Sequence, residues 1–250
     1  MGGIMRIAVL TLYTPNISNY ADITTSIHEQ YCEHNDYTYI KYTDTLDASR
    51  PPSWSKILAL KNNMDDFDWI LWIDADTLIN NHDIRIESLI DENYNIVMCG
   101  DTTFVLNCGV MLIKCCKENK LFLDKIYNMT QFINSGIWEQ EAIITYYKRH
   151  RQQFKLIPQQ KLNSYMNNIN QDGFIMHFPG SYRGYMMDVL QMYLNGDFSA
   201  GKLRYIHFKN KLQLNINNNK PWYFEIEDNW WHGMNEEQFL DKVSNDKFRI

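Results

Sequence analysis

The sequence lacks any segment that would cross or target a membrane. None of its 250 residues belongs to a run approaching the roughly 20 apolar residues that a membrane helix needs. The start of the chain, Met-Gly-Gly-Ile-Met-Arg, has neither the apolar region nor the cleavage site of a signal peptide. Arg6 occupies the position where an N-myristoylation signal has Ser or Thr. We therefore expect no membrane span and no lipid anchor.

Cysteine is sparse, and its spacing argues against a zinc site. The five cysteines include two adjacent residues and no Cys-x-x-Cys pair. An odd count without paired spacing indicates reduced thiols that pack as small hydrophobic side chains. They are Cys32, Cys99, Cys108, Cys115 and Cys116.

Positive charge is in deficit. Lys and Arg number 24 against 30 Asp and Glu, which gives a net charge of −6 and a pI near 5.6. This balance argues against a surface for nucleic acid or for an anionic membrane, so we expect no nucleic-acid partner. The hydrophobic fraction of 45% and the aromatic fraction of 14% are enough for a large core. A chain of this length fits one large α/β domain, or one domain with a small appendage.

Strand and helix patterns alternate along the first part of the chain. This alternation predicts parallel strands with right-handed crossovers, and ligands at the carboxyl ends of the strands. Ser53 is the expected N-cap of the second helix, and Gly109 predicts an interruption of its strand by a bulge or a close backbone approach. The expected strands are 6–12, 37–42, 69–73, 95–99, 104–114 and 174–178, and the expected helices are 20–34, 54–64, 117–132 and 138–149.

Residues 69–78, Trp-Ile-Leu-Trp-Ile-Asp-Ala-Asp-Thr-Leu, join an apolar run to two aspartates. Five consecutive apolar residues predict a strand that is buried on both faces. Side chains at positions i and i+2 of an extended chain point the same way, so we expect Asp74 and Asp76 to face one point. Their carboxylates repel each other unless a hard divalent cation supplies the opposing charge. The pattern therefore predicts a metal–phosphate site.

Three reaction types use an acidic pair at the end of a strand. Haloacid-dehalogenase-type phosphoryl transfer needs Asp-x-Asp-x-Thr, but here Thr77 falls one residue early and Leu78 takes the required position. Nucleotidyl transfer usually uses a Gly-rich basic loop near the N-terminus, and residues 13–16 contain neither glycine nor lysine. In glycosyl transfer from a nucleotide sugar, the cation bridges the diphosphate and neutralises charge on the departing nucleotide. The neighbouring residues favour this third type.

The chain contains four short motifs in this order: Pro52–Lys56, Trp69–Thr77, Asn107–Ile113, and Glu139–Ala142 followed by His177–Gly180. Together they resemble glycosyltransferase family 34. This family holds fungal α-mannosyl- and α-galactosyltransferases and plant xyloglucan xylosyltransferases, and family 8 is similar in its Asp-x-Asp and Asn-x-Gly-Val motifs. The resemblance covers roughly residues 50–185.

The resemblance implies the GT-A fold, an α/β fold with a Rossmann-like, mostly parallel central sheet flanked by helices. It also implies an order of functions along a single domain. A nucleotide-binding half would cover about 5–100, a donor-sugar and acceptor half about 101–210, and a C-terminal extension 211–250.

The resemblance further implies a set of metal ligands. Asp74 and Asp76 match the ligands of the metal and of the ribose and diphosphate. His177 matches a third metal ligand, a neutral imidazole suited to Mn²⁺. His207 is the competing ligand, and Lys209 lies near it in the sequence to meet a phosphate. The expected cofactor is Mn²⁺ or Mg²⁺.

Roles in donor binding and transfer follow from the same resemblance. Gln140 matches the residue beneath the anomeric carbon of the donor, and Glu139 matches the acid beside it. Asn107 fits a donor-sugar contact, because an amide both donates and accepts hydrogen bonds. Lys56 would offer charge to the donor or to the aspartates. Arg183 stands near the position of a family lysine and can bind a diphosphate bidentately.

We therefore expect a metal-dependent, retaining glycosyltransferase. It would move a sugar from a nucleotide-sugar donor, UDP-linked in preference to GDP-linked, to a hydroxyl of an oligosaccharide or glycoprotein. The acceptor hydroxyl would attack from the front face, since a covalent intermediate would need Glu139 or Glu141 as nucleophile.

Two alternatives stay open for the activity and one for the location. The chain could be a non-catalytic nucleotide-sugar or glycan-binding module, or a metal-dependent phosphotransferase. Without an anchor in the sequence, we expect a cytoplasmic enzyme. The alternative is a catalytic domain trimmed from a Golgi enzyme.

Overall fold

The computed structural model describes residues 5–101, 104–166, 168, 170, 172–199, 202, 203 and 206. The chain divides into two compact units, Met1–Ser164 with Asp172–His177, and Tyr165–Gln171 with Phe178–Ile250. Every described strand lies in the first unit. The expected functional boundaries near residues 100 and 210 stay a prediction.

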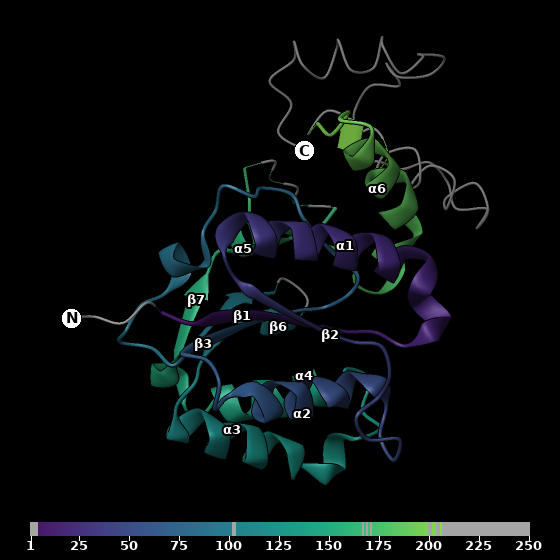
Figure 1. Cartoon of the computed structure of the whole chain (residues 1–250). Helices are drawn as coiled ribbons and strands as arrows, with labels where there is room; N and C mark the ends of the chain where they lie inside the picture. Colours follow the sequence, from purple (N-terminus) through teal and green to yellow (C-terminus); the bar gives the residue numbers. More distant parts are fainter. Residues whose placement is uncertain are drawn as a thin grey trace, which may run out of the picture. The chain divides into compact units, whose positions relative to one another are not determined.

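A six-stranded sheet forms the centre of the first unit (Figure 1). The strands β2, β1 and β3 are parallel, as the alternating pattern predicts, and β5 and β7 are also parallel. Only β6, among the strands of this sheet, runs antiparallel to its neighbours β3 and β5. In spatial order the strands are β2 (Thr38–Tyr42), β1 (Ile7–Leu12), β3 (Trp69–Ile73), β6 (Leu106–Lys114), β5 (Ile96–Gly100) and β7 (Phe154–Ile157).

Helices cover both faces of this sheet. Figure 1 shows α1 on one face and α2, α3 and α4 on the other. The α-helices of the first unit are α1 (Ser18–Asn35), α2 (Ser55–Asn63), α3 (Lys117–Tyr127), α4 (Trp138–Tyr147) and α5 (Gln159–Leu162). Its 3-10 helices are Pro15–Ile17, Pro52–Trp54, Ile86–Leu89, Thr130–Phe132 and Arg151–Gln153. None of the described helices is long and apolar enough to cross a membrane.

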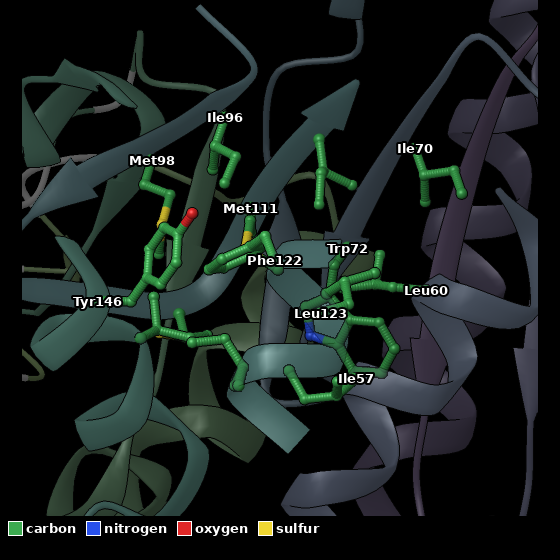
Figure 2. Close-up of a cluster of buried hydrophobic side chains, with 14 of the residues drawn as sticks. Ile57, Leu60, Ile70, Trp72, Ile96, Met98, Met111, Phe122, Leu123 and Tyr146 are labelled. Atoms are coloured by element: carbon green, nitrogen blue, oxygen red, sulfur yellow. The ribbon is translucent and has the colours of Figure 1, made fainter. Parts of the chain in front are cut away.

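The central strand β3 is buried on both faces, as its uninterrupted apolar sequence predicts. Ile70 and Trp72 point to the face of α2, α3 and α4, where they join a cluster with Leu60 of α2 and Phe122 of α3 (Figure 2). Burying side chains of this size contributes roughly 1.5–3 kcal/mol each to folding. This cluster anchors the strand that carries Asp74 at its end.

The alternate residues of β3 face α1. Trp69, Leu71 and Ile73 share a second cluster with Tyr31 and Cys32 of α1. The strict alternation between two apolar clusters fixes the register of β3, because a slip of one residue would exchange its two faces. The end of the strand is thereby held in place.

A second, smaller sheet brings distant segments to the end of β3. Its order is β4 (Thr77–Ile79), β9 (Ile175–His177) and β8 (Asn163–Ser164). The strands β4 and β9 are antiparallel, and Thr77 is paired with His177. The sheet therefore places His177 next to the acidic turn that precedes β4.

The predicted interruption of the strand at residues 107–109 is wrong, because β6 runs without a break from Leu106 to Lys114. The register between β5 and β6 shifts between the pairs Val97–Leu112 and Cys99–Asn107. Gly109 lies within this β-bulge or irregularity of the pairing. Gly109 also makes the predicted close approach, to the ring of His177.

Several predicted helix boundaries are wrong. The helix expected at 20–34 spans Ser18–Asn35, and the helix expected to reach residue 149 ends at Tyr147. The helix expected to reach residue 132 ends at Tyr127, and a separate 3-10 helix follows it.

Ser53 is also not the N-cap of α2, because it lies inside the 3-10 helix Pro52–Trp54 and the N-cap position is Trp54. Proline at the first position presets a helical φ angle, so the helical turn begins before the expected cap.

The second unit contributes two described helical segments. The 3-10 helix Gly180–Tyr185 leads directly into α6 (Met186–Leu194). Tyr182 packs against Tyr165 and Tyr185, with ring centroids 5.8 Å and 6.2 Å away. These aromatic contacts hold the short helix within its own unit.

Candidate active site

The acidic pair lies in a turn, and the prediction that an extended chain aligns it is wrong. The strand β3 ends at Ile73, and Ala75 and Asp76 form a turn before β4. The amide of Asp74 donates to the carbonyl of Gly109 (2.8 Å), and the Thr77 hydroxyl donates to the carbonyl of Asp74 (2.7 Å). These backbone contacts set the positions of the two carboxylates.

Helix α1 supports the same turn from behind. The hydroxyl of Thr24 donates to the carbonyl of Ala75 (2.7 Å), and Nε2 of His28 donates to the carbonyl of Thr77 (3.1 Å). Burial lowers the pKa of His28 to about 3, so its imidazole is neutral at pH 7. Two side chains one helical turn apart therefore satisfy two carbonyls of the acidic turn.

Asp74, Asp76 and His177 come together as a possible metal-ligand set. Potential ligand atoms of the three residues all lie within 4.8 Å of one another. Nε2 of His177 is 3.2 Å from Oδ1 of Asp76, and both side chains are buried. Two carboxylates and an imidazole can bind a divalent cation such as Mn²⁺.

Gly109 leaves the space that the His177 ring occupies. A Cβ atom added at Gly109 would lie 2.2 Å from Cε1 of His177 and 2.9 Å from Nε2. Both distances are shorter than any real contact of a Cβ atom, so only glycine accommodates the ring where it lies.

Lys56 bridges Asp74 and Glu139 below the turn. Its Nζ lies 3.2 Å from Oδ1 of Asp74, 3.0 Å from Oε1 of Glu139 and 3.0 Å from the carbonyl of Cys108. Burial alone would lower the pKa of Lys56, but the two carboxylates outweigh it and raise the pKa. Trp72 also donates to Oδ1 of Asp74 (2.6 Å). The lysine is a buried cation that offsets charge within the site.

The start of β6 and the start of α4 meet beside this cluster. Oε1 of Gln140 accepts a hydrogen bond from the amide of Cys108 (3.0 Å). Oδ1 of Asn107 accepts one from the amide of Gly109 and one from Nδ2 of Asn163, both at 2.8 Å. The structure therefore places Asn107, Gln140 and Glu139 in one network with the acidic turn.

The roles of three predicted site residues stay untested. Arg183 lies on the 3-10 helix of the second unit, and its contact with a diphosphate stays a prediction. His207 and Lys209 lie outside the described residues.

The sequence reasoning did not single out four residues that the structure places in or behind the site. Thr24, His28, Trp72 and Asn163 all make the contacts described above. The polar pair at i and i+4 on the buried face of α1 was a usable signal, because such groups need buried partners. Asn163 gave no such signal, since its strand has only two residues.

Comparison with protein families confirms the predicted resemblance for the first part of the chain. Residues 6–98 match the galactosyl transferase GMA12/MNN10 family, which is glycosyltransferase family 34. This range includes the acidic turn and Lys56, and it ends before Asn107. No curated protein sequence matches the chain.

Solved structures confirm the predicted fold. A glycosyltransferase involved in the glycosylation of the major capsid of PBCV-1 is 20% identical, with a TM-score of 0.65 over 75% of this chain and 99% of that chain. The galactosyltransferase LgtC, solved with donor and acceptor sugar analogues, is 10% identical, with a TM-score of 0.56 over 80% of this chain and 99% of that chain. The glycosyltransferase GlyE of Streptococcus pneumoniae TIGR4 is 11% identical, with a TM-score of 0.55 over 86% of this chain and 64% of that chain. The chain therefore has the GT-A glycosyltransferase fold, with a first part that matches the galactosyl transferase GMA12/MNN10 family.

Proposed function

We propose that the protein is a metal-dependent, retaining glycosyltransferase that uses a UDP- or GDP-linked sugar and a glycan hydroxyl. The observation that carries this proposal is the convergence of Asp74, Asp76 and His177 within 4.8 Å. These residues lie where β3 ends, and ligands of parallel α/β sheets bind at the carboxyl ends of strands. The family match and the fold support glycosyl transfer as the reaction class.

The residues present fit a divalent cation. Carboxylate oxygens and a neutral imidazole are suitable ligands for Mn²⁺, and the carboxylates also suit Mg²⁺. Because Gly109 has no side chain, the His177 ring has room to lie beside Asp76. A bound cation would neutralise negative charge on the departing nucleoside diphosphate.

Lys56 acts on the site through the carboxylates that it holds. An ammonium group has three N–H donors, and Asp74, Glu139 and the Cys108 carbonyl are each within donor distance of it. No N–H is then left for a phosphate or a sugar. The earlier hypothesis that Lys56 offers charge to the aspartates is thus supported by its contacts, in preference to direct contact with the donor.

The burial of Glu139 argues against a covalent intermediate on Glu139 and so favours front-face attack over that route. Its carboxylate is 5% exposed and its Oε1 is paired with Lys56. A nucleophile for a covalent intermediate must reach the anomeric carbon, and a buried, ion-paired carboxylate is a poor candidate for that role. The other candidate nucleophile, Glu141, is half-buried and stays an alternative. Gln140, half-buried next to the Cys108 amide, is the better candidate for the group beneath the anomeric carbon.

A thermal-shift panel tests this proposal. UDP, GDP and their glucose, galactose, mannose and xylose derivatives are compared with and without Mn²⁺ for the wild-type chain, Asp76→Asn and Asp66→Asn. Asp66 is exposed and serves as the matched control. We expect Mn²⁺-dependent stabilisation by at least one nucleotide sugar, lost in Asp76→Asn and kept in Asp66→Asn. The absence of metal-dependent stabilisation by every nucleotide would reject the proposal.

A transfer assay separates this function from its alternatives. Release of the nucleoside diphosphate together with a glycosylated acceptor supports the transferase. Binding of the nucleotide sugar without turnover on any glycan acceptor would instead indicate a binding module, and release of phosphate from a phosphomonoester would indicate a phosphotransferase.

A further inference from the structure

The hydrogen-bond partners of Asn107 fix the orientation of its side-chain amide. The backbone amide of Gly109 can only donate, so the Asn107 atom 2.8 Å from it is the carbonyl oxygen Oδ1. The Asn163 atom that lies 2.8 Å from the same oxygen must then be its donor, Nδ2. A rotation of the Asn107 amide by half a turn would bring its N–H groups against two donors.

The N–H₂ group of Asn107 is left to donate to a ligand. Both printed hydrogen bonds of this side chain use Oδ1, and Nδ2 makes none with the described residues. The backbone groups next to Asn107 are already hydrogen-bonded to other residues of the site. The Gly109 carbonyl accepts from the Asp74 amide, and the Cys108 amide donates to Oε1 of Gln140. Asn107 therefore offers a donor, and no acceptor, at this edge of the site.

Burying Asn163 costs free energy that its hydrogen bonds must offset. It is 0% exposed on β8, and its own Oδ1 has no hydrogen-bond partner among the described residues. A buried amide oxygen without a partner is unfavourable, and an apolar side chain of similar size would avoid this penalty. Its Nδ2 donates to Oδ1 of Asn107 (2.8 Å) and more weakly to Sγ of Cys99 (3.5 Å), and the shorter bond to Asn107 is the main gain from an asparagine at this position.

We propose that Asn163 is a positioning residue that holds the Asn107 amide with its N–H₂ directed at an acceptor oxygen of the donor sugar. This inference rests on the proposed function. It specifies that the site selects the sugar of the donor through one oriented N–H donor. The proposed metal ligands, by contrast, would hold the cation that meets the diphosphate, whichever sugar the diphosphate carries.

The test replaces Asn163 with aspartate and measures the contribution of the sugar to binding. Asn163→Asp keeps the size of the side chain but sets an acceptor against Oδ1 of Asn107. Asn119→Asp is the matched control, because Asn119 is also 0% exposed, donates through Nδ2 to two carbonyls and has an Oδ1 without a partner among the described residues. One of its acceptors is Lys114, at the opposite end of β6 from Asn107.

Calorimetry with Mn²⁺ gives the affinities of each variant for UDP-galactose and GDP-mannose, with UDP and GDP as sugar-free references. For each base, the affinity for the nucleotide sugar divided by the affinity for the sugar-free nucleotide gives the contribution of the sugar to binding. We expect Asn163→Asp to reduce this ratio by about three- to tenfold, the value of one hydrogen bond, with affinity for the sugar-free nucleotide unchanged. Asn119→Asp should keep the wild-type ratio.

A double-mutant cycle with Asn107→Ala tests whether Asn163 acts through Asn107. In the Asn107→Ala background, Asn163→Asp should produce no further loss, whereas independent roles would give additive losses and overturn the inference. If Asn163→Asp does not fold, Asn163→Ser, which falls short of Asn107, is judged by the same criteria.

The outcomes separate this inference from the proposed function. If the wild-type chain binds nucleotide sugars and Asn163→Asp keeps the wild-type ratio, the inference is wrong and the proposed function stands. A wild-type ratio of one also overturns the inference, because the sugar then gains nothing from Asn107. If the wild-type chain binds no nucleotide with Mn²⁺, the proposed function fails and this inference fails with it.

Discussion

The ring of His177 lies where a side chain on Gly109 would have to be. A Cβ atom at Gly109 would stand 2.2 Å from Cε1 and 2.7 Å from Nδ1 of His177, well inside van der Waals contact. The two residues belong to β6 and β9, strands of different sheets. The position of a proposed metal ligand is thus set by a glycine 68 positions earlier in the chain (177 minus 109).

Gly109→Ala should therefore displace His177 and weaken metal binding. We expect Mn²⁺ affinity to fall by about tenfold or more, and stability to fall by about 1–3 kcal/mol from overpacking. Isothermal titration with Mn²⁺ and urea denaturation measure the two effects. Gly136→Ala is the control, because an added Cβ there meets nothing within 4 Å. Unchanged Mn²⁺ affinity in Gly109→Ala would show that His177 is not a ligand.

Lys56→Met should destabilise the fold far more than the loss of an exposed lysine. It removes the cation between Asp74 and Glu139 and leaves two carboxylates without their partner, for an expected loss of about 3–5 kcal/mol in urea denaturation. Lys61→Met, which breaks the exposed ion pair with Asp124, should cost about 0–1 kcal/mol. Equal losses in the two variants would contradict a structural role for the buried ion pairs.

His28 should make the protein less stable in mild acid. The folded protein holds its pKa at about 3 and the unfolded chain at about 6.5, so between these values the unfolded state binds the extra proton. The contribution of neutral, buried His28 to the free energy of unfolding is therefore fully present above pH 6.5. It is lost at roughly 1.4 kcal/mol per pH unit as the pH falls.

His28→Gln provides the comparison, because glutamine can still donate to the Thr77 carbonyl but does not titrate. Its free energy of unfolding should decline less steeply than that of the wild type between pH 6 and pH 4. The carboxylates titrate in both proteins, so their contribution cancels in the difference. Parallel curves would show that His28 is not buried in its neutral form.

Gln140→Ala should separate binding from turnover. The side chain contacts the Cys108 amide and no proposed metal ligand, so affinity for the nucleoside diphosphate with Mn²⁺ should stay within about twofold. Transfer should fall at least about tenfold if Gln140 lies beneath the anomeric carbon. Gln131→Ala, at an exposed position, is the control. Wild-type turnover in Gln140→Ala would show that Gln140 does not lie beneath the anomeric carbon of the donor sugar.

The sequence predicts the parts of the fold that depend on local pattern. The alternation of strands and helices around residues 6–73 and the apolar run before Asp74 are visible in the order of residues, and the structure agrees with both. Contacts between distant short segments leave no such pattern. Lys56 and Glu139 are 83 positions apart, and the pairing of Thr77 with His177 involves strands of three residues each. Tertiary packing, which no local propensity encodes, decides these contacts.

The reversed direction of β6 has a consequence for how the site can vary. Because β6 runs against β3, the beginning of β6 and the end of β3 meet at one edge, where Val110 is paired with Ile73. Asn107 therefore lies in a strand that is hydrogen-bonded to β3, the strand that ends directly before Asp74. The spacing between the proposed metal ligand Asp74 and the amide of Asn107 is then set by the sheet. Substitutions in the surrounding loops would change which ligands reach this edge of the sheet, without altering the distance between Asp74 and Asn107.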